Sequence, residues 1–215
     1  MDKFIFIFDL DGTLIESKNS IISSFNEVFL KNKLKPTTSI EFTKLANFGS
    51  KFFIKKKFPN LNEKEIIKIN NQFQNTYKIN CTKKIKLKKG VKYFLKKYKA
   101  KANFYIATNK PKFSSIKILN FFGIKSYFNE VYSGSNKNFK KPYGNKLREK
   151  ISNFKKKNKV IVIGDSEADE KLAKINNIEF ALIKNGYAKK NLKKFKKKYL
   201  FENFFELSNI LLNDY

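Results

Sequence analysis

Short apolar runs alternate with segments of helical periodicity along most of the chain. Three runs, Lys3–Asp9, Asn103–Ala107 and Lys159–Ile163, are nearly continuous, which is typical of strands buried on both faces of a parallel sheet. Weaker strands are predicted at Glu130–Ser133 and Glu179–Ile183. Helices are predicted at Val91–Lys99, Phe113–Phe122, Pro142–Phe154, Glu167–Asn176 and Glu202–Leu212. This alternation predicts an α/β fold with right-handed crossovers and an open, doubly wound, mostly parallel sheet.

The pattern changes between about Ser17 and Lys89, where strand-like runs are missing. Apolar residues there recur at helical spacing in Ser20–Lys31, Ser39–Asn47 and Asn62–Tyr77. We therefore expect a helical domain over residues 17–86, inserted after the first strand of an α/β core that comprises residues 1–16 and 87–215.

The composition supports a packed globule and removes several kinds of chemistry. Of the 215 residues, 41% are hydrophobic and 24 are Phe, so the chain can form a sizeable core. Cys81 is the single cysteine, which excludes a disulfide framework and a cysteine-rich metal site. The sequence has no histidine, which excludes Ser-His-Asp and Cys-His catalysis. Acid–base chemistry must then use carboxylates, lysine, tyrosine or water.

The net charge of +29 has two interpretations. It can indicate a lysine-rich protein that binds nucleic acid or another polyanion. It can also reflect coding bias, because Lys, Asn, Ile, Phe and Tyr, all encoded by AT-rich codons, make up 129 of 215 residues. Arginine, which grips phosphates bidentately, occurs only at Arg148, and the lysines are spread along the chain. We favour bias and expect no specific nucleic-acid partner, only weak, salt-sensitive binding to polyanions.

No segment predicts a membrane span or a secretory signal. The N-terminal apolar stretch Phe4–Phe8 has five residues, whereas a signal core needs roughly 7–15 and a membrane helix about 20. Lysine interrupts the later apolar runs. We expect a soluble, cytoplasmic protein without membrane partners.

Two aspartates follow the first predicted strand, in Asp9-Leu10-Asp11-Gly12-Thr13. Ligands of open α/β sheets bind beyond the carboxyl ends of the strands. Two carboxylates that converge there repel each other unless a cation or a shared proton intervenes, and Mg²⁺ prefers oxygen ligands. The alternative is an ordinary Asp-Gly turn that caps the next helix.

Further polar residues follow the two other strong strands. Asp165 can supply a third carboxylate to the same ion, and it can also be the N-cap of the next helix, since the two roles are compatible. Asp169 lies one turn further on and can be a metal ligand, a partner of a ligand, a lysine's counter-ion or a solvated residue. Thr108 offers a hydroxyl, followed by backbone N–H groups suited to an oxyanion.

The order of these motifs resembles the haloacid dehalogenase superfamily over nearly the whole chain. The resemblance rests on Asp9-x-Asp11-Gly-Thr, Thr108, Lys141-Pro142 and Gly164-Asp165-Ser166-x-x-Asp169. Ala-Thr-Asn-Lys-Pro at 107–111, Gly-Asp-Ser-Glu at 164–167 and Asn-Gly-Tyr at 185–187 are similar to the phosphoglycolate phosphatase branch. That branch implies a Rossmann-like core with a small helical cap domain after the first strand.

The resemblance also implies roles for individual residues. Asp9 would be the nucleophile that forms an aspartyl-phosphate, and Asp11 the general acid and base. Mg²⁺ would be held by Asp9, the backbone carbonyl of Asp11, and Asp165, with Asp169 at or behind the ion. The phosphoryl oxygens would be bound by Thr108, Asn109 and Lys141.

The sequence therefore predicts a Mg²⁺-dependent phosphomonoesterase that acts on a small phosphorylated metabolite such as phosphoglycolate. A pyrophosphatase or a nucleotide phosphatase would share the same motifs. A sugar-phosphate mutase is less favoured, since related mutases usually carry Glu-Asp where this chain has Gly164-Asp165. A dehalogenase is disfavoured because Asp11 is present. The alternative that is not an enzyme is a lysine-rich protein that binds polyanions. The chain is expected to be a monomer or a homodimer.

The resemblance also implies that substrate specificity lies in the cap. The segment Asn47–Lys51 is a candidate substrate contact, or else a plain turn between helices. Hinges of cap closure are expected near Glu16–Lys18 and Lys86–Gly90.

Overall fold

The computed structural model describes residues 4–45, 49–187 and 191–213. The chain divides into two compact units. One, which we call the α/β unit, comprises Met1–Glu16 and Lys86–Tyr215, and the other, the helical unit, comprises Ser17–Ile85.

The α/β unit is built on a six-stranded sheet of order β5-β4-β1-β6-β7-β8, in which every neighbouring pair is parallel. The strands are β1 (Phe4–Phe8), β4 (Ala102–Thr108), β5 (Phe128–Ser133), β6 (Lys159–Gly164), β7 (Glu179–Ile183) and β8 (Tyr199–Phe201). The predicted doubly wound, mostly parallel α/β fold is confirmed. The strand β8 was not predicted, because the lysine run before it reads as a solvated segment.

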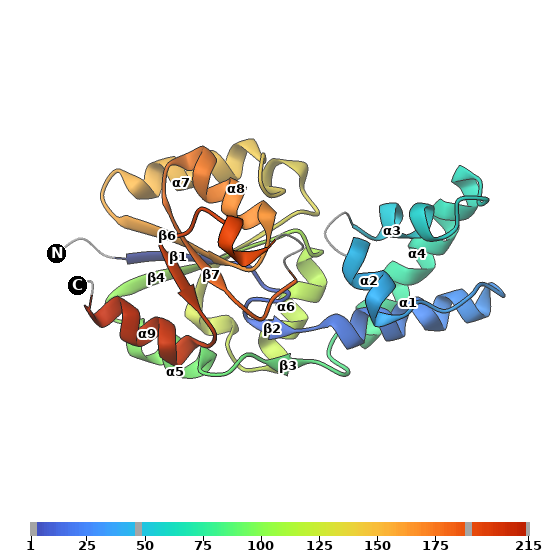
Figure 1. Ribbon diagram of the computed structural model, residues 1–215, viewed down its shortest axis with the longest axis horizontal. Helices are drawn as coiled ribbons and strands as arrows, with labels where there is room; N and C mark the ends of the chain where they lie inside the picture. The colour runs from blue at the N-terminus through green and yellow to red at the C-terminus, as the bar shows by residue number, and fades with distance from the viewer. Residues whose placement is uncertain (1–3, 46–48, 188–190, 214–215) are drawn as a thin grey trace. The chain divides into compact units, whose positions relative to one another are not determined.

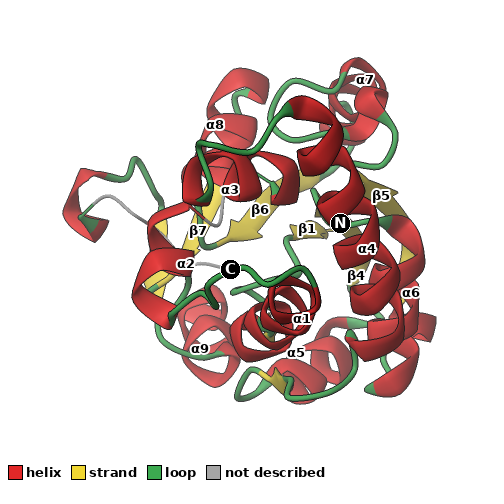
Figure 2. Cartoon of the chain, turned by 90° about the vertical axis from the view of Figure 1, so that its right-hand side faces the viewer, coloured by secondary structure: helices red, strands yellow, loops and turns green. Residues whose placement is uncertain are grey.

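Helices cover both faces of this sheet. In Figure 1, α7 and α8 lie along one face and α5 and α9 along the other, and Figure 2 shows the strands, in yellow, between the helices, in red. The helices are α5 (Val91–Tyr98), α6 (Lys112–Phe121), α7 (Asn145–Lys155), α8 (Glu167–Asn176) and α9 (Phe204–Asn213), with short 3₁₀ turns η2 (Lys125–Tyr127), η3 (Lys137–Phe139) and η4 (Leu192–Lys194). The helix α7 begins later than the predicted Pro142, after Gly144 as its N-cap.

The first strand contributes to a hydrophobic layer on each face of the sheet. Ile5 and Ile7 lie in one cluster with Leu147 of α7 and Leu172 of α8. Phe6 and Phe8 point the other way, and their rings lie 5.3 and 6.0 Å from that of Phe94 in α5. The alternation of side chains along a strand thus buries β1 on both faces, as its continuous apolar run predicts.

A second, very short sheet joins β2 (Ile15–Glu16) to β3 (Lys86–Leu87) in antiparallel fashion. Two-residue strands carry no periodicity, so the hydrophobic pattern does not predict them. They lie at the two ends of the segment that leaves the α/β unit and returns to it.

The helical unit has four described helices around a core of phenylalanines. They are α1 (Lys18–Lys31), α2 (Ser39–Leu45), α3 (Ser50–Lys57) and α4 (Glu63–Asn80). Stacked and tilted ring contacts join Phe25 to Phe29, Phe53 and Phe73. The helix α4 begins with the predicted asparagine cap, because Asn62 and Glu65 form a capping box.

The helix α3 was not predicted, since Gly49 and a run of lysines interrupt its apolar pattern. Of the candidate substrate segment Asn47–Lys51, residues 47 and 48 lie outside the described residues. The Ser50 hydroxyl donates to Asn70 and accepts from Gln74, both of α4, and Lys51 pairs with Glu63. Within the described residues, no helix is long and apolar enough to cross a membrane.

Candidate active site

The candidate site lies at the carboxyl ends of three neighbouring strands. Because β1 pairs with β4 on one side and β6 on the other, Phe8 lies level with Ile106 and Ile163. The predicted side chains come one or two residues further along these strands: Asp9 follows β1, Thr108 ends β4 and Asp165 follows β6. Parallel pairing therefore brings together residues that are far apart in the sequence.

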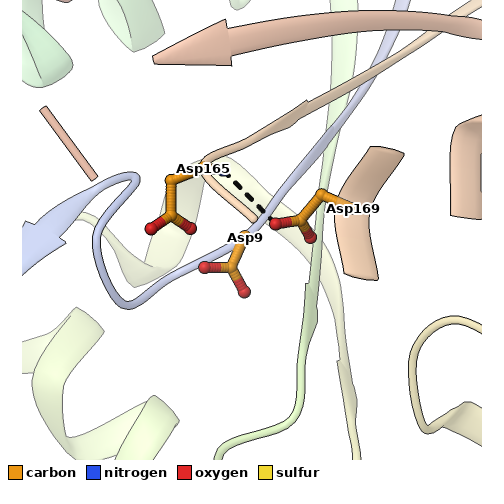
Figure 3. A group of neighbouring side chains, drawn as sticks. All are labelled: Asp9, Asp165 and Asp169. Carbon is orange, nitrogen blue, oxygen red and sulfur yellow. Dashed lines mark hydrogen bonds between the residues drawn. The ribbon is translucent and has the colours of Figure 1, made fainter. Parts of the chain in front are cut away.

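Three buried carboxylates converge at this edge. Each of Asp9, Asp165 and Asp169 offers an oxygen, and these oxygens lie within 4.8 Å of one another. Figure 3 shows Asp9 and Asp165 approaching from separate loops while Asp169 reaches in from α8. Three of the four predicted carboxylates thus lie in one cluster.

The ammonium group of Lys141 lies inside this cluster. Its Nζ is 2.5 Å from Asp9 Oδ1 and 2.5 Å from Asp169 Oδ1. Burial lowers the pKa of Lys141, but the carboxylates of Asp169 and Asp9 more than offset this, so its pKa is raised and it stays charged. Of the alternatives for Asp169, the structure supports the counter-ion of a lysine.

One ammonium does not neutralise three buried carboxylates. Burial raises the pKa of Asp9 to about 7, where Lys141 opposes the shift and Asp169 and Asp11 add to it. Burial, followed by the charges of Asp9 and Asp169, also raises the pKa of Asp165 well above its ordinary value. This surplus of negative charge, carried by hard oxygen donors, fits a divalent cation such as Mg²⁺.

Glycines make room for the Asp165 carboxylate. Gly12 has φ +89°, and a Cβ there or at Gly186 would overlap the Asp165 side chain. The Asp165 carboxylate accepts hydrogen bonds from the backbone N–H of Tyr187 and, at 3.3 Å, from the Thr13 hydroxyl. A side chain at either glycine would therefore displace Asp165, and the same loops supply hydrogen-bond donors to its carboxylate.

The capping of α8 differs from one sequence interpretation. Ser166, not Asp165, is the N-cap, and it forms a capping box with Asp169. The Asp169 Oδ2 atom accepts from the Ser166 hydroxyl at 2.6 Å and from its backbone N–H at 3.1 Å. Asp165 is therefore free of a capping role, and Asp169 is held firmly between Ser166 and Lys141.

The second aspartate of the first motif has a different partner. Asp11 Oδ2 lies 3.0 Å from the Nζ of Lys110, and the Asp11 side chain is 20% exposed. The Thr108 Oγ1 atom accepts a hydrogen bond from the backbone N–H of Lys110 at 3.2 Å. Asp11 is thus reachable from solvent while the nucleophile candidate Asp9 lies deeper.

The Asn109 side chain holds the main chain of Lys141. Its amide nitrogen donates to the Lys141 carbonyl at 3.2 Å, and its oxygen accepts from the Lys141 N–H at 2.9 Å. This pair of bonds connects the end of β4 to the loop before α7. It gives Asn109 a task that the sequence did not suggest.

Two contributors to the site were missed. Lys110 is one lysine among 46, so its identity carries little information, although its place directly after Thr108 and Asn109 could have singled it out. Tyr187 acts through its backbone N–H, which any residue except proline possesses. The Asn-Gly-Tyr segment at 185–187 contains this residue, but no residue type in it predicts the contact.

Comparisons with known proteins agree with this geometry. The chain is 27% identical over 186 residues to a phosphoglycolate phosphatase of Cereibacter sphaeroides, covering 84% of this chain and 85% of that protein. It is 25% identical over 189 residues to one of Aquifex aeolicus, with 87% of each chain covered.

Solved structures share the fold. A predicted phosphoglycolate phosphatase from Haemophilus somnus superimposes with a TM-score of 0.86 at 24% identity, covering 96% of this chain and 97% of that one. CbbY from Rhodobacter sphaeroides in complex with phosphate gives a TM-score of 0.80 at 20% identity, with 96% of each chain covered. The model of the haloacid dehalogenase-like hydrolases matches residues 6–183. This chain therefore belongs to the family of haloacid dehalogenase-like hydrolases, as its motifs indicated.

Proposed function

We propose that this chain is a Mg²⁺-dependent phosphatase that hydrolyses a small phosphorylated metabolite through a phosphoryl group carried on Asp9. The observation that supports this most directly is the cluster of Asp9, Asp165 and Asp169 around Lys141, at the carboxyl edge of a parallel sheet. A buried carboxylate that faces an ammonium group and can share a cation is suited to attack phosphorus.

The first step is transfer of the phosphoryl group to Asp9. A carboxylate oxygen of Asp9 forms a bond to phosphorus as the bond from phosphorus to the leaving oxygen breaks. Lys141, within 2.5 Å of Asp9 Oδ1, supplies positive charge for the phosphoryl oxygens. Thr108, at the end of β4, contributes a hydroxyl and the backbone after it.

Asp11 moves the protons. It donates one to the leaving oxygen in the first step and takes one from water in the second. That water forms a bond to phosphorus, the bond to Asp9 breaks, and inorganic phosphate and the free Asp9 carboxylate result. The position of Asp11 two residues after Asp9, with a partly exposed carboxylate, suits this task.

The metal would be held by the carboxylates of Asp9 and Asp165 and by the backbone carbonyl of Asp11. When bound, it would neutralise the charge between nucleophile and phosphate. Asp169 pairs with Lys141 and accepts a hydrogen bond from Ser166, so it would orient the residues that hold the metal without binding the metal itself.

The relatives favour phosphoglycolate as the substrate. Seven curated proteins match, and each one is named phosphoglycolate phosphatase, at 24–28% identity. We further propose that the helical unit acts as a cap whose closure excludes water, with hinges beside β2 and β3. Crosslinking the two units should then abolish turnover, and unchanged turnover would count against a moving cap.

Phosphate release tests the proposal. Wild-type protein is incubated with phosphoglycolate, other small phosphate esters, pyrophosphate and nucleotides, with Mg²⁺ and with a chelator. We expect selective, Mg²⁺-dependent release that Asp9→Asn lowers by roughly 10³-fold or more, because the amide cannot attack phosphorus. The surface variant Glu149→Gln, which also removes one negative charge, should retain the full rate.

The panel also separates the alternatives. Release from pyrophosphate or a nucleotide alone would keep the chemistry and change the substrate. Isomer conversion without release of phosphate would indicate a mutase. No release from any compound by folded protein would overturn the proposal, and polyanion binding unaffected by Asp9→Asn would then favour a binding protein.

A further inference from the structure

Two lysines differ from the rest. Among the residues that the structure describes, Lys110 and Lys141 are the buried lysines. A buried ammonium is costly unless a carboxylate faces it, so its position reflects more than the lysine-rich composition. Lys141 is already part of the proposed chemistry. Lys110 is not, although its side chain is only 4% exposed.

The main chain fixes Lys110 at the end of two strands. Its N–H donates to the Thr108 hydroxyl of β4 at 3.2 Å. Its carbonyl accepts from the Ser133 hydroxyl of β5 at 2.7 Å, a buried bond. Pro111 follows as the N-cap residue of α6. The base of the side chain is therefore held from both sides.

The tip of Lys110 faces Asp11. Its Nζ lies 3.0 Å from Asp11 Oδ2, within the range of a charge-assisted hydrogen bond. Asp11 lies on a loop and is 20% exposed, so without a partner its carboxylate could adopt several rotamers. Proton transfer needs the carboxylate within about 2.6–3.2 Å of the reacting oxygen. A fixed ammonium restricts the carboxylate to one orientation.

We infer that Lys110 is a positioning residue that holds the Asp11 carboxylate in the orientation needed for proton transfer to and from the substrate oxygen. This inference rests on the proposed phosphatase function. It assigns the two buried lysines to the two aspartates of the first motif: Lys141 to Asp9, and Lys110 to Asp11. The competing role is direct contact between Lys110 and the phosphoryl group.

A double-mutant cycle in turnover distinguishes these roles. Wild type, Lys110→Met, Asp11→Asn and the double variant are compared, with Lys112→Met as the control because Lys112 is an exposed lysine of the same segment. If Lys110 acts through Asp11, Lys110→Met lowers kcat for an alkyl phosphate about 10- to 100-fold with little change in KM. On the Asp11→Asn background the same change then lowers kcat less than about twofold.

Substrates with different leaving groups distinguish positioning of Asp11 from a merely structural role of Lys110, because a structural role would not change the relative rates of these substrates. Nitrophenolate leaves without a proton, whereas an alkoxide needs one from Asp11. In single turnovers, Lys110→Met should therefore slow release of the alcohol more than release of nitrophenolate. Equal slowing of both, with weaker inhibition by inorganic phosphate and a full effect on the Asp11→Asn background, would overturn the inference in favour of direct phosphate contact.

Unfolding experiments test the pairing of Lys110 with Asp11 independently of any phosphatase activity. The same four proteins are unfolded in urea, and we expect Asp11→Asn to offset part of the loss caused by Lys110→Met. This coupling between the two substitutions is measured without substrate. If the wild-type protein is inactive, the proposed phosphatase function is rejected, but the Lys110–Asp11 pair can still be tested. Additive losses would contradict the pairing itself.

A charge-retaining variant covers the case in which Lys110→Met does not fold. Lys110→Arg keeps the cation but places it differently, because the guanidinium is longer and planar. We expect it to fold and to lower kcat for the alkyl phosphate severalfold with KM unchanged. A wild-type kcat with both leaving groups would contradict a role in positioning.

Discussion

At the scale of single residues, close packing around Asp165 determines where its carboxylate lies. A Cβ on Gly186 would overlap the Asp165 side chain, and the next residue, Tyr187, donates its N–H to that carboxylate. We expect Gly186→Ala to displace Asp165 and to weaken Mg²⁺ binding about tenfold or more, measured by calorimetry on the folded protein. The expected loss of stability is roughly 1–3 kcal/mol, as for overpacked sites.

A matched variant separates displacement from general destabilisation. Ile161→Val in β6 removes one buried methylene, should cost about 0.5–1.5 kcal/mol, and leaves the strand end untouched. It should bind Mg²⁺ like wild type. Equal affinities for the two variants would show that Gly186 does not shape the site.

The residue scale also explains what the sequence could and could not reveal of the site. Asp9 and Asp165 were predictable because carboxylates directly after strands are few in a chain with 18 acidic residues, and Asp169 because it lies one helical turn after Asp165. Lys110 is one of 46 lysines, so its residue type carries little information, and it is distinguished by its place after Thr108 and Asn109 together with its burial. The Asn109 bonds to Lys141 depend on a loop conformation that no spacing encodes.

At the scale of elements, one carboxylate ties the start of α2 to the end of α3. Glu41 accepts from the Thr38 N–H at 2.9 Å and from Lys57 at 3.0 Å. These bonds, with that of Thr38 first, lower the pKa of Glu41 from 4.5 to about 2. The folded state thus binds fewer protons than the unfolded one, and the stabilisation is present above pH 4.5 and lost as the pH falls toward 2.

We therefore expect Glu41→Gln to destabilise the chain at pH 7 by about 1 kcal/mol or less, because the side chain is partly exposed. The difference in the free energy of unfolding between this variant and wild type should shrink as the pH falls from 4.5 toward 2. Urea unfolding at several pH values across that range measures it. Glu149→Gln, which changes the net charge equally at an exposed site, is the control. A stability difference that stays constant with pH would contradict the role of the ionised Glu41 carboxylate in joining α2 to α3.

Elements differ in how well the sequence predicts them, for physical reasons. The strand β1 was predictable because burial on both faces demands a continuous apolar run. The helix α3 was not, because only Phe53 and Ile54 of its eight residues are buried and three lysines end it. The strands β2 and β3 have two residues each and exist through their pairing with one another.

At the scale of the whole molecule, the α/β unit contains all the predicted catalytic, metal-binding and phosphate-binding residues, which are Asp9, Asp11, Thr108, Asn109, Lys141, Asp165 and Asp169. It also has its own aromatic core, in which Phe6 and Phe8 contact Phe94. We therefore expect the α/β unit to fold, and to bind metal, without the helical unit.

The pair of β2 and β3 provides a way to test this. Glu16 pairs with Lys86, and the Lys88 N–H donates to the Leu14 carbonyl at 2.9 Å, so the two ends of the inserted segment lie side by side. Residues 17–85 can then be replaced by an Asn-Gly turn, which favours the twist of a two-residue hairpin. The product has roughly 150 residues, enough to bury about 68–70% of its unfolded surface.

We expect this shortened chain to unfold in one cooperative transition and to gain thermal stability on addition of Mg²⁺, as the full chain should. Asp165→Asn in either chain should abolish that gain, which serves as the control. Hydrolysis of nitrophenyl phosphate should persist, whereas turnover of the metabolite should fall, because the proposed cap contributes water exclusion and substrate discrimination rather than the reacting groups. Loss of the Mg²⁺ effect in a well-folded shortened chain would show that the helical unit completes the metal site, and would contradict its assignment to the α/β unit alone.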